Sequence, residues 1–246
     1  SAVEAAVTET AGPYSNTDLV GDFNGNQKDD VLRLKTGAGC DATLNIDGLS
    51  QATTLTQNAQ TAVGFCFESS FSQVGDFNGD GTDDLAAASH YGLLTAAAQA
   101  PYAGQGYGFY DAFLAVLLFQ NGQVTSSYVA PVGAPGSGGA AGYHASGQTQ
   151  GLIAGDFNGD GLTDIFRGSI FISTGSSLVK QTWANQGWGR VGDFNGDGLA
   201  DLFILSGTNG TTSRLAISNG QGFDIVPIGL TLTNYADTNW PEFVNS

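Results

Sequence analysis

A ten-residue segment that occurs four times constrains this chain more than any other feature. It spans residues 21–30, 75–84, 155–164 and 192–201, and three copies read Gly-Asp-Phe-Asn-Gly-Asp-Gly, two variable residues, then Asp. A small apolar residue precedes each copy, and an apolar run follows it. Such a repeat indicates one supersecondary unit used several times, and this pattern predicts strand, tight acidic loop, strand in each unit.

A second β-rich run lies downstream of each copy and predicts the rest of the unit. The runs cover residues 43–48, 117–122, 170–175 and 215–220, and each ends in a turn dipeptide. Another extended stretch leads to the next copy, and no sustained helical periodicity interrupts the pattern. Each unit is therefore predicted to be a four-stranded antiparallel sheet with the acidic loop in its first hairpin.

The spacing of the copies predicts an all-β fold, a small β-propeller with four blades of four antiparallel strands. The copies begin at residues 21, 75, 155 and 192, and the shortest spacing, 37 residues, just holds four short strands. We expect a single domain over residues 1–246, with repeat units of about 21–74, 75–154, 155–191, and 192–246 plus 1–20. Pairing of the chain ends is expected to close the ring and leave no long free edge. An open array, completed by a partner chain or by flanking sequence, is the alternative.

The acidic loops carry oxygen atoms at a spacing typical of a calcium site. Counted from the first Asp, side-chain oxygens occupy positions 1, 3, 5 and 9, Gly at position 6 permits a sharp bend, and the carbonyl of position 7 adds an oxygen. Ca²⁺ accepts roughly six to eight such hard oxygens in a flexible geometry. The predicted ligands are Asp76, Asn78, Asp80, Thr82 and Asp84 in the second loop, Asp156, Asn158, Asp160, Leu162 and Asp164 in the third, and Asp193, Asn195, Asp197, Leu199 and Asp201 in the fourth.

The first loop departs from this pattern. Its predicted ligands are Asp22, Asn24, Asn26, the carbonyl of Lys28, and Asp30, which is one carboxylate fewer than in the other loops. Gln27 replaces the turn glycine, and Lys28 adds a positive charge. We therefore expect three strong calcium sites and a weaker fourth, each ion pinning one hairpin.

Two other interpretations of the loops fit the sequence less well. Four plain solvated turns would crowd like charges, which repel one another unless a cation neutralises them. An EF-hand needs Glu at position 12 and flanking helices, and the chain has neither.

Charge and composition exclude some partners. The chain has 23 Asp and Glu against 7 Lys and Arg, a net charge of −16, so it lacks the basic surface that binds nucleic acid. No apolar run of about 18 residues predicts insertion into a membrane. Charged residues make up only 12% of the chain and 37 residues are Gly, which is typical of secreted all-β proteins. In that setting a disulfide between Cys40 and Cys66 is favoured over two buried thiols.

At the acidic loops the chain resembles the FG-GAP/VCBS repeat family. Its four motif copies with their flanking strands organise almost the whole sequence. The family includes the propellers of integrin α-chains and mushroom propeller lectins, and it is found in many secreted microbial proteins. The resemblance implies a β-propeller with structural Ca²⁺ in the loops, although family members more often have seven blades than four. Because the family's activities include adhesion, sugar binding and polysaccharide lysis, it indicates the fold better than the function.

The long second unit holds most of the candidate ligand-binding residues. Carbohydrate sites typically combine aromatic rings, on which sugar C–H faces stack, with polar groups that bind the hydroxyls. The candidates are Tyr91, Tyr102, Tyr107, Tyr110, Tyr143, His144 and, with Trp183 before the fourth loop, Trp188. The alternative interpretation is that these rings cap a small propeller or pack its long loops down.

We therefore expect a secreted, calcium-stabilised binding module whose partner is a glycan or a cell-surface glycoprotein. One alternative is a protein-binding adhesion module. Another is a polysaccharide lyase, in which a base, an acid and a neutralising group would come from His90, Tyr91, Tyr143, His144 and Arg167. No spacing forces these residues together, so no catalytic residue is assigned.

Overall fold

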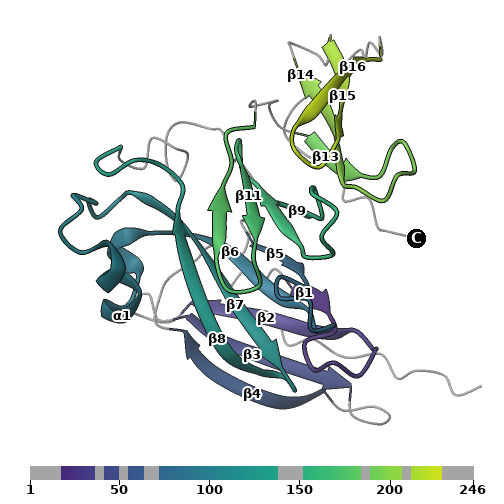
Figure 1. Cartoon of the computed structure of the whole chain (residues 1–246). Coiled ribbons are helices and arrows are strands. Elements are labelled where there is room, and N and C mark those ends of the chain that lie inside the picture. The colour runs from purple at the N-terminus through teal and green to yellow at the C-terminus, as the bar shows by residue number, and fades with distance from the viewer. Residues whose placement is uncertain are drawn as a thin grey trace, which may run out of the picture.

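The computed structural model describes residues 18–36, 42–49, 55–63, 72–137, 152–183, 189–206 and 212–228. The strands in these ranges form four antiparallel sheets of four strands, each in chain order (Figure 1). No helix in the described ranges is long and apolar enough to cross a membrane. The predictions of an all-β chain and of four-stranded units are confirmed.

Each sheet begins with the short strand that precedes an acidic loop. The first sheet contains β1 (Asp18–Gly21), β2 (Asp30–Thr36), β3 (Ala42–Leu49) and β4 (Leu55–Val63). The second contains β5 (Ser72–Gly75), β6 (Asp84–His90), β7 (Ala112–Gln120) and β8 (Gln123–Pro131). The third contains β9 (Ile153–Gly155), β10 (Asp164–Phe166), β11 (Ile170–Ser173) and β12 (Leu178–Lys180). The fourth contains β13 (Gly189–Gly192), β14 (Asp201–Ser206), β15 (Thr212–Ser218) and β16 (Phe223–Pro227).

Turn chemistry sets the hairpins. The β7–β8 turn uses Asn121 and Gly122, whose φ angles of 52° and 71° match the two-residue turn that suits strand twist. Between β6 and β7 the chain leaves the second sheet in a long excursion. It is formed by η2 (Tyr91–Leu93), α1 (Ala96–Gln99), η3 (Ala100–Tyr102) and the loop that follows.

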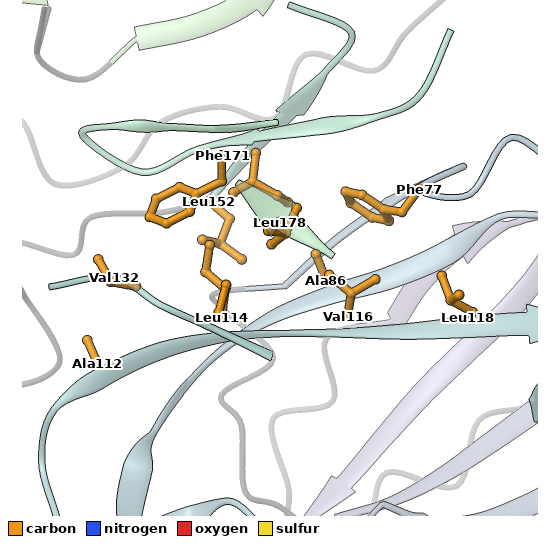
Figure 2. Packing of buried hydrophobic residues seen from close by; sticks show 12 residues of the cluster. Phe77, Ala86, Ala112, Leu114, Val116, Leu118, Val132, Leu152, Phe171 and Leu178 are labelled. Atoms are coloured by element: carbon orange, nitrogen blue, oxygen red, sulfur yellow. The ribbon is translucent and has the colours of Figure 1, made fainter. Parts of the chain in front are cut away.

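Buried side chains form three clusters, one between each pair of successive sheets. The strand β7 is buried from Ala112 to Phe119, and its side chains alternate between two clusters. Phe113 belongs to the cluster between the first and second sheets. Leu114 packs with Phe171 of the third sheet (Figure 2). The sheets in the middle of the array are therefore apolar on both faces. We call each contact between successive sheets a joint.

The first strands of the sheets follow one another through the array but do not complete a ring. β5 packs beside β1, β9 beside β5, and β13 beside β9, whereas comparable packing of β13 on β1 is missing from the described residues. Figure 1 shows the fourth sheet (β13–β16) well away from the first (β1–β4). Residues 1–17 and 229–246, whose pairing is expected to close the ring, lie outside the described residues, as do Cys40 and Cys66.

Candidate functional site

Hydrogen bonds from the backbone wind each acidic loop around its first carboxylate. In the third loop, Asp156 at position 1 accepts from the amides of Gly159 at 2.7 Å and Gly161 at 2.9 Å. The amide of Asp160 donates to the Asn158 side-chain oxygen at 3.0 Å. Gly159 and Gly161 have φ angles of 79° and 85°, which residues with a Cβ atom rarely adopt. The same bonds to position 1 recur in the second and fourth loops.

In the second, third and fourth loops the aspartate at position 9 is fully buried and ties the loop to the third strand of its sheet. Asp164 is 0% exposed; one of its carboxylate oxygens accepts from the amide of Phe157 at 3.0 Å and the other from Ser173 at 2.8 Å. Asp84 and Asp201 make the equivalent pairs of bonds. Position 9 therefore acts as a bracket within its sheet, a role that the ligand pattern alone did not reveal.

Burial also shifts the pKa of two of these carboxylates, Asp84 and Asp164. The pKa of Asp84 is raised to about 7, mainly because burial penalises the charged form. The charges of Asp80 and Asp76 act in the same direction, while the amide hydrogen bonds oppose it. Asp164 has its pKa raised to about 7 by the same causes. Positions 1, 5 and 9 thus lie within one another's field, where a divalent cation would offset the repulsion.

The donor set of the second, third and fourth loops suits Ca²⁺. Two carboxylates and one amide oxygen stand at positions 1, 5 and 3 of one tight turn, and all are hard oxygens. No group of three His, Cys, Asp or Glu side chains that could hold a metal occurs in the part of the chain that is described. The residue at position 3 is Asn, whose amide side chain is not one of these groups. The Asp at position 9 accepts hydrogen bonds from backbone amides instead.

The first loop differs in its hydrogen bonds as well as its sequence. Gln27 takes the left-handed conformation that glycine has elsewhere, with a φ of 64°. In the other loops the Asn at position 3 donates to the Asp at position 5, but Asn24 donates to Asp30 at 2.9 Å. The second oxygen of Asp30 is buried and has no hydrogen-bond partner among the residues that the structure describes. That the first loop is the weakest calcium site stays a prediction.

Each of the first three acidic loops also contacts the acidic loop of the next sheet. At the second joint, the Thr163 amide donates to the carbonyl of Asp76 at 2.8 Å, and the Ser173 hydroxyl donates to the carbonyl of Phe77 at 2.6 Å. A Cβ placed on Gly79 would lie 2.8 Å from Cδ2 of Leu162, the residue at position 7. The candidate metal loops are therefore part of the joints between sheets.

Three of the candidate tyrosines pack inward. Tyr91, Tyr102 and Tyr107 lie against the cluster of the first joint, with Phe113 at ring-centroid distances of 5.0–5.8 Å. The Tyr102 hydroxyl donates to the carbonyl of Val129 at 2.9 Å, and burial raises the pKa of Tyr102. These rings match the alternative interpretation, in which they pack the long excursion down.

Tyr110 and its neighbour Phe109 point outward instead. Their side chains are 63% and 55% exposed, and their rings meet edge to face with centroids 4.9 Å apart. His90 lies 5.0 Å from the Phe109 ring and its Nδ1 is 2.8 Å from the Phe109 carbonyl oxygen. Buried Asp111 accepts from the amides of Gly108 and Gly136 at 2.7 and 2.8 Å. We call Phe109 and Tyr110 the aromatic platform.

The groups considered for catalysis are buried, partly buried or outside the described residues. His90 and Arg167 are each 5% exposed, and Tyr91 packs in the aromatic cluster. Trp183, considered as a second platform, packs against Phe223 with centroids 5.3 Å apart. Tyr143, His144 and Trp188 lie outside the described residues.

Comparison with known proteins yields one solved structure of interest. No family model and no curated protein matches the chain. The structure is similar to that of an Agrocybe aegerita lectin, described as recognising non-reducing terminal N-acetylglucosamine, with 14% sequence identity and a TM-score of 0.49. The match covers 85% of this chain and 51% of the lectin, so the chain spans about half the length of that protein. A likeness of this degree does not identify a ligand.

Proposed function

We propose that the chain is a secreted, calcium-stabilised module with propeller-type blades that binds carbohydrate on the aromatic platform. The observation that carries this proposal is the exposure of Phe109 and Tyr110 on a buttressed loop. Two large rings open to solvent, side by side, are uncommon unless they meet a partner.

The platform suits a sugar for physical reasons. The apolar face of a pyranose stacks on an aromatic ring, and the Tyr110 hydroxyl can exchange hydrogen bonds with sugar hydroxyls. The loop is already ordered by Asp111 and by the bonds of the Tyr91 and Gly92 amides to the carbonyls of Asp111 and Phe109, at 2.8 and 2.9 Å. A preordered site loses less conformational entropy on binding.

Calcium has a structural role in this proposal. The acidic loops combine winding hydrogen bonds, mutually repelling carboxylates and hard oxygens, and they lie in the joints. Asp, Asn and carbonyl oxygens at positions 1, 3, 5 and 7 would hold each ion. Its charge would offset the carboxylate repulsion and so stabilise the stacking of one sheet on the next.

A glycan array probed in millimolar Ca²⁺ and again in EDTA tests the proposal. We expect glycan binding in Ca²⁺, and a loss of at least tenfold in affinity for the best glycan with Tyr110→Ala. Val226→Ala, which alters a 44% exposed side chain on β16, is the matched control and should bind normally. No binding to any glycan in either condition would discard the proposal. A protein ligand that deglycosylation leaves unaffected would favour adhesion instead, and unsaturated products from uronate polymers would favour a lyase.

A further inference from the structure

The fourth sheet exposes a face that the other sheets bury. The phenylalanine at position 2 of the acidic loop is 0% exposed in Phe23, Phe77 and Phe157, but Phe194 is 46% exposed. Its backbone is placed as in the others, because the Phe194 amide donates to Asp201 at 2.9 Å. Phe194 is therefore exposed because none of the sheets in the described residues covers it as a following sheet covers Phe23, Phe77 and Phe157.

The exposed face continues along the fourth sheet. Phe203 on β14 is half-buried, whereas its equivalents Ala86 and Phe166 are buried in the joints that follow their sheets. On β15, Leu215 and Ile217 are also half-buried. This face is one half of a joint.

The first sheet carries the complementary half. Val20 precedes the first loop and is 56% exposed, while Asp29 at position 8 is also exposed. Their equivalents in the second sheet, Val74 and Asp83, are so close to Gly21 that a Cβ there would lie 2.7 Å from each.

Asp29 also repeats the chemistry of Asp83. The Asp83 amide donates to the carbonyl of Asp22 at 2.9 Å, and its carboxylate accepts from the Asp22 amide at 2.7 Å. Asp29 has the same side chain at the same loop position, and Asp193 offers the same backbone groups as Asp22.

We propose that the fourth sheet docks the first sheet of a second copy of this chain, head to tail. Val20 and Asp29 of one copy would pack on Gly192 and Phe194 of the other, repeating the contacts of the three joints within a chain. The two halves are on different surfaces, so the association is heterologous and extends until a ring closes. The proposal does not depend on carbohydrate binding.

Two charge variants separate this arrangement from its alternatives. Val20→Asp disables one half-joint and Phe194→Asp the other, and both side chains are substantially exposed, so neither change removes core packing. Sedimentation should be measured over a concentration series in Ca²⁺ and physiological salt, which screens repulsion between these acidic chains. We expect wild type to form assemblies of two or more chains, and each variant alone to be monomeric. An equimolar mixture of the two variants should form a one-to-one dimer, since each supplies the half that the other lacks.

The other outcomes overturn the proposal. If wild type stays monomeric at every concentration, the fourth sheet either packs on the first sheet of its own chain or has no partner sheet. A Val20→Asp protein that still assembles would indicate an isologous interface. Val179→Asp, at a 45% exposed position on β12, is the control and should assemble as wild type does. Circular dichroism of each variant verifies that it is folded.

Discussion

The amide of Ala200 donates a 2.7 Å hydrogen bond to the carbonyl oxygen of Asp156, which ties the fourth acidic loop to the third. Thr163 is bound in the same way to Asp76, and Asp83 to Asp22, at 2.8 and 2.9 Å. The first residue of each of these loops is thus both a candidate metal ligand and an anchor for the next sheet. Cation binding and packing between sheets are therefore expected to be coupled.

Removal of calcium should weaken the joints. We expect the melting temperature to be lower in EDTA than in millimolar Ca²⁺, because the loop carboxylates then repel one another without compensation. Hydrogen exchange should show the largest loss of protection at the amides of Asp83, Thr163 and Ala200. The amide of Leu117, paired with Leu85 inside the second sheet, serves as the internal reference. Equal melting temperatures in the two buffers would refute the coupling.

Repair of the first loop should strengthen its calcium site. In a double variant, Asn26→Asp restores the missing carboxylate. Gln27→Gly places glycine at a left-handed position, which costs a non-glycine residue roughly 1–2 kcal/mol. Isothermal titration calorimetry should show one more tight site than in wild type. Asp160→Asn in the third loop is the opposite change and should remove one. An unchanged stoichiometry in both variants would contradict the assignment of the ligands.

A serine hydroxyl at the third joint should contribute measurably to stability. The Ser218 hydroxyl is buried and donates to the carbonyl of Phe157 at 2.6 Å. Ser218→Ala leaves that carbonyl without its partner and should lower the free energy of unfolding by roughly 1–3 kcal/mol. Ser177→Ala removes a hydroxyl bonded only at the surface, to Thr174, and should change it by less than about 0.5 kcal/mol. Urea denaturation compares the two.

The glycine before each of the first three loops should not tolerate a side chain. A Cβ on Gly155 would lie 2.7 Å from that of Ala200, so Gly155→Ala must push the third and fourth sheets apart. We expect a loss of roughly 1–3 kcal/mol, as for an overpacked core. In Gly108→Ala the new methyl group has no atom nearer than 3.8 Å, and stability should be unchanged or slightly higher. Thermal melts that rank the two variants the other way would show that the joint yields.

Alkaline pH should destabilise the fold partly through Tyr128. Burial, with a smaller contribution from the charge of Asp84, raises the pKa of Tyr128 to about 12, although its hydroxyl lies 3.4 Å from that of Ser173. The unfolded tyrosine loses its proton near pH 10, so stability is intact below that value and falls as pH rises from about 10 to 12. Tyr128→Phe should reduce this slope in urea titrations at several pH values. The same slope in both proteins would contradict the inferred burial of the hydroxyl.

The sequence predicts this molecule best where local chemistry decides the structure. Alternating apolar runs and turn dipeptides identify the strands, and the Asp and Gly spacing identifies the loops, because these depend on neighbours along the chain. The orientation of the tyrosines does not follow from such patterns. Tyr107 packs inward and Tyr110 points outward because of the path that their loop takes. That path brings the Phe109 ring so close to Gly92 that a Cβ on Gly92 would lie 2.1 Å from it. The bracketing role of position 9 depends on contacts with a strand far along the chain, as between Asp84 and Phe119.

The shared construction of the joints bears on how such chains change in length. Each joint pairs a position-8 amide with a position-1 carbonyl beside a glycine, so a duplicated unit brings both halves of its own interface. Gene duplication therefore lengthens the array in register without a new contact surface having to evolve. Val20 on the first sheet and Phe194 on the fourth are exposed, and they mark the two faces to which a further unit would attach.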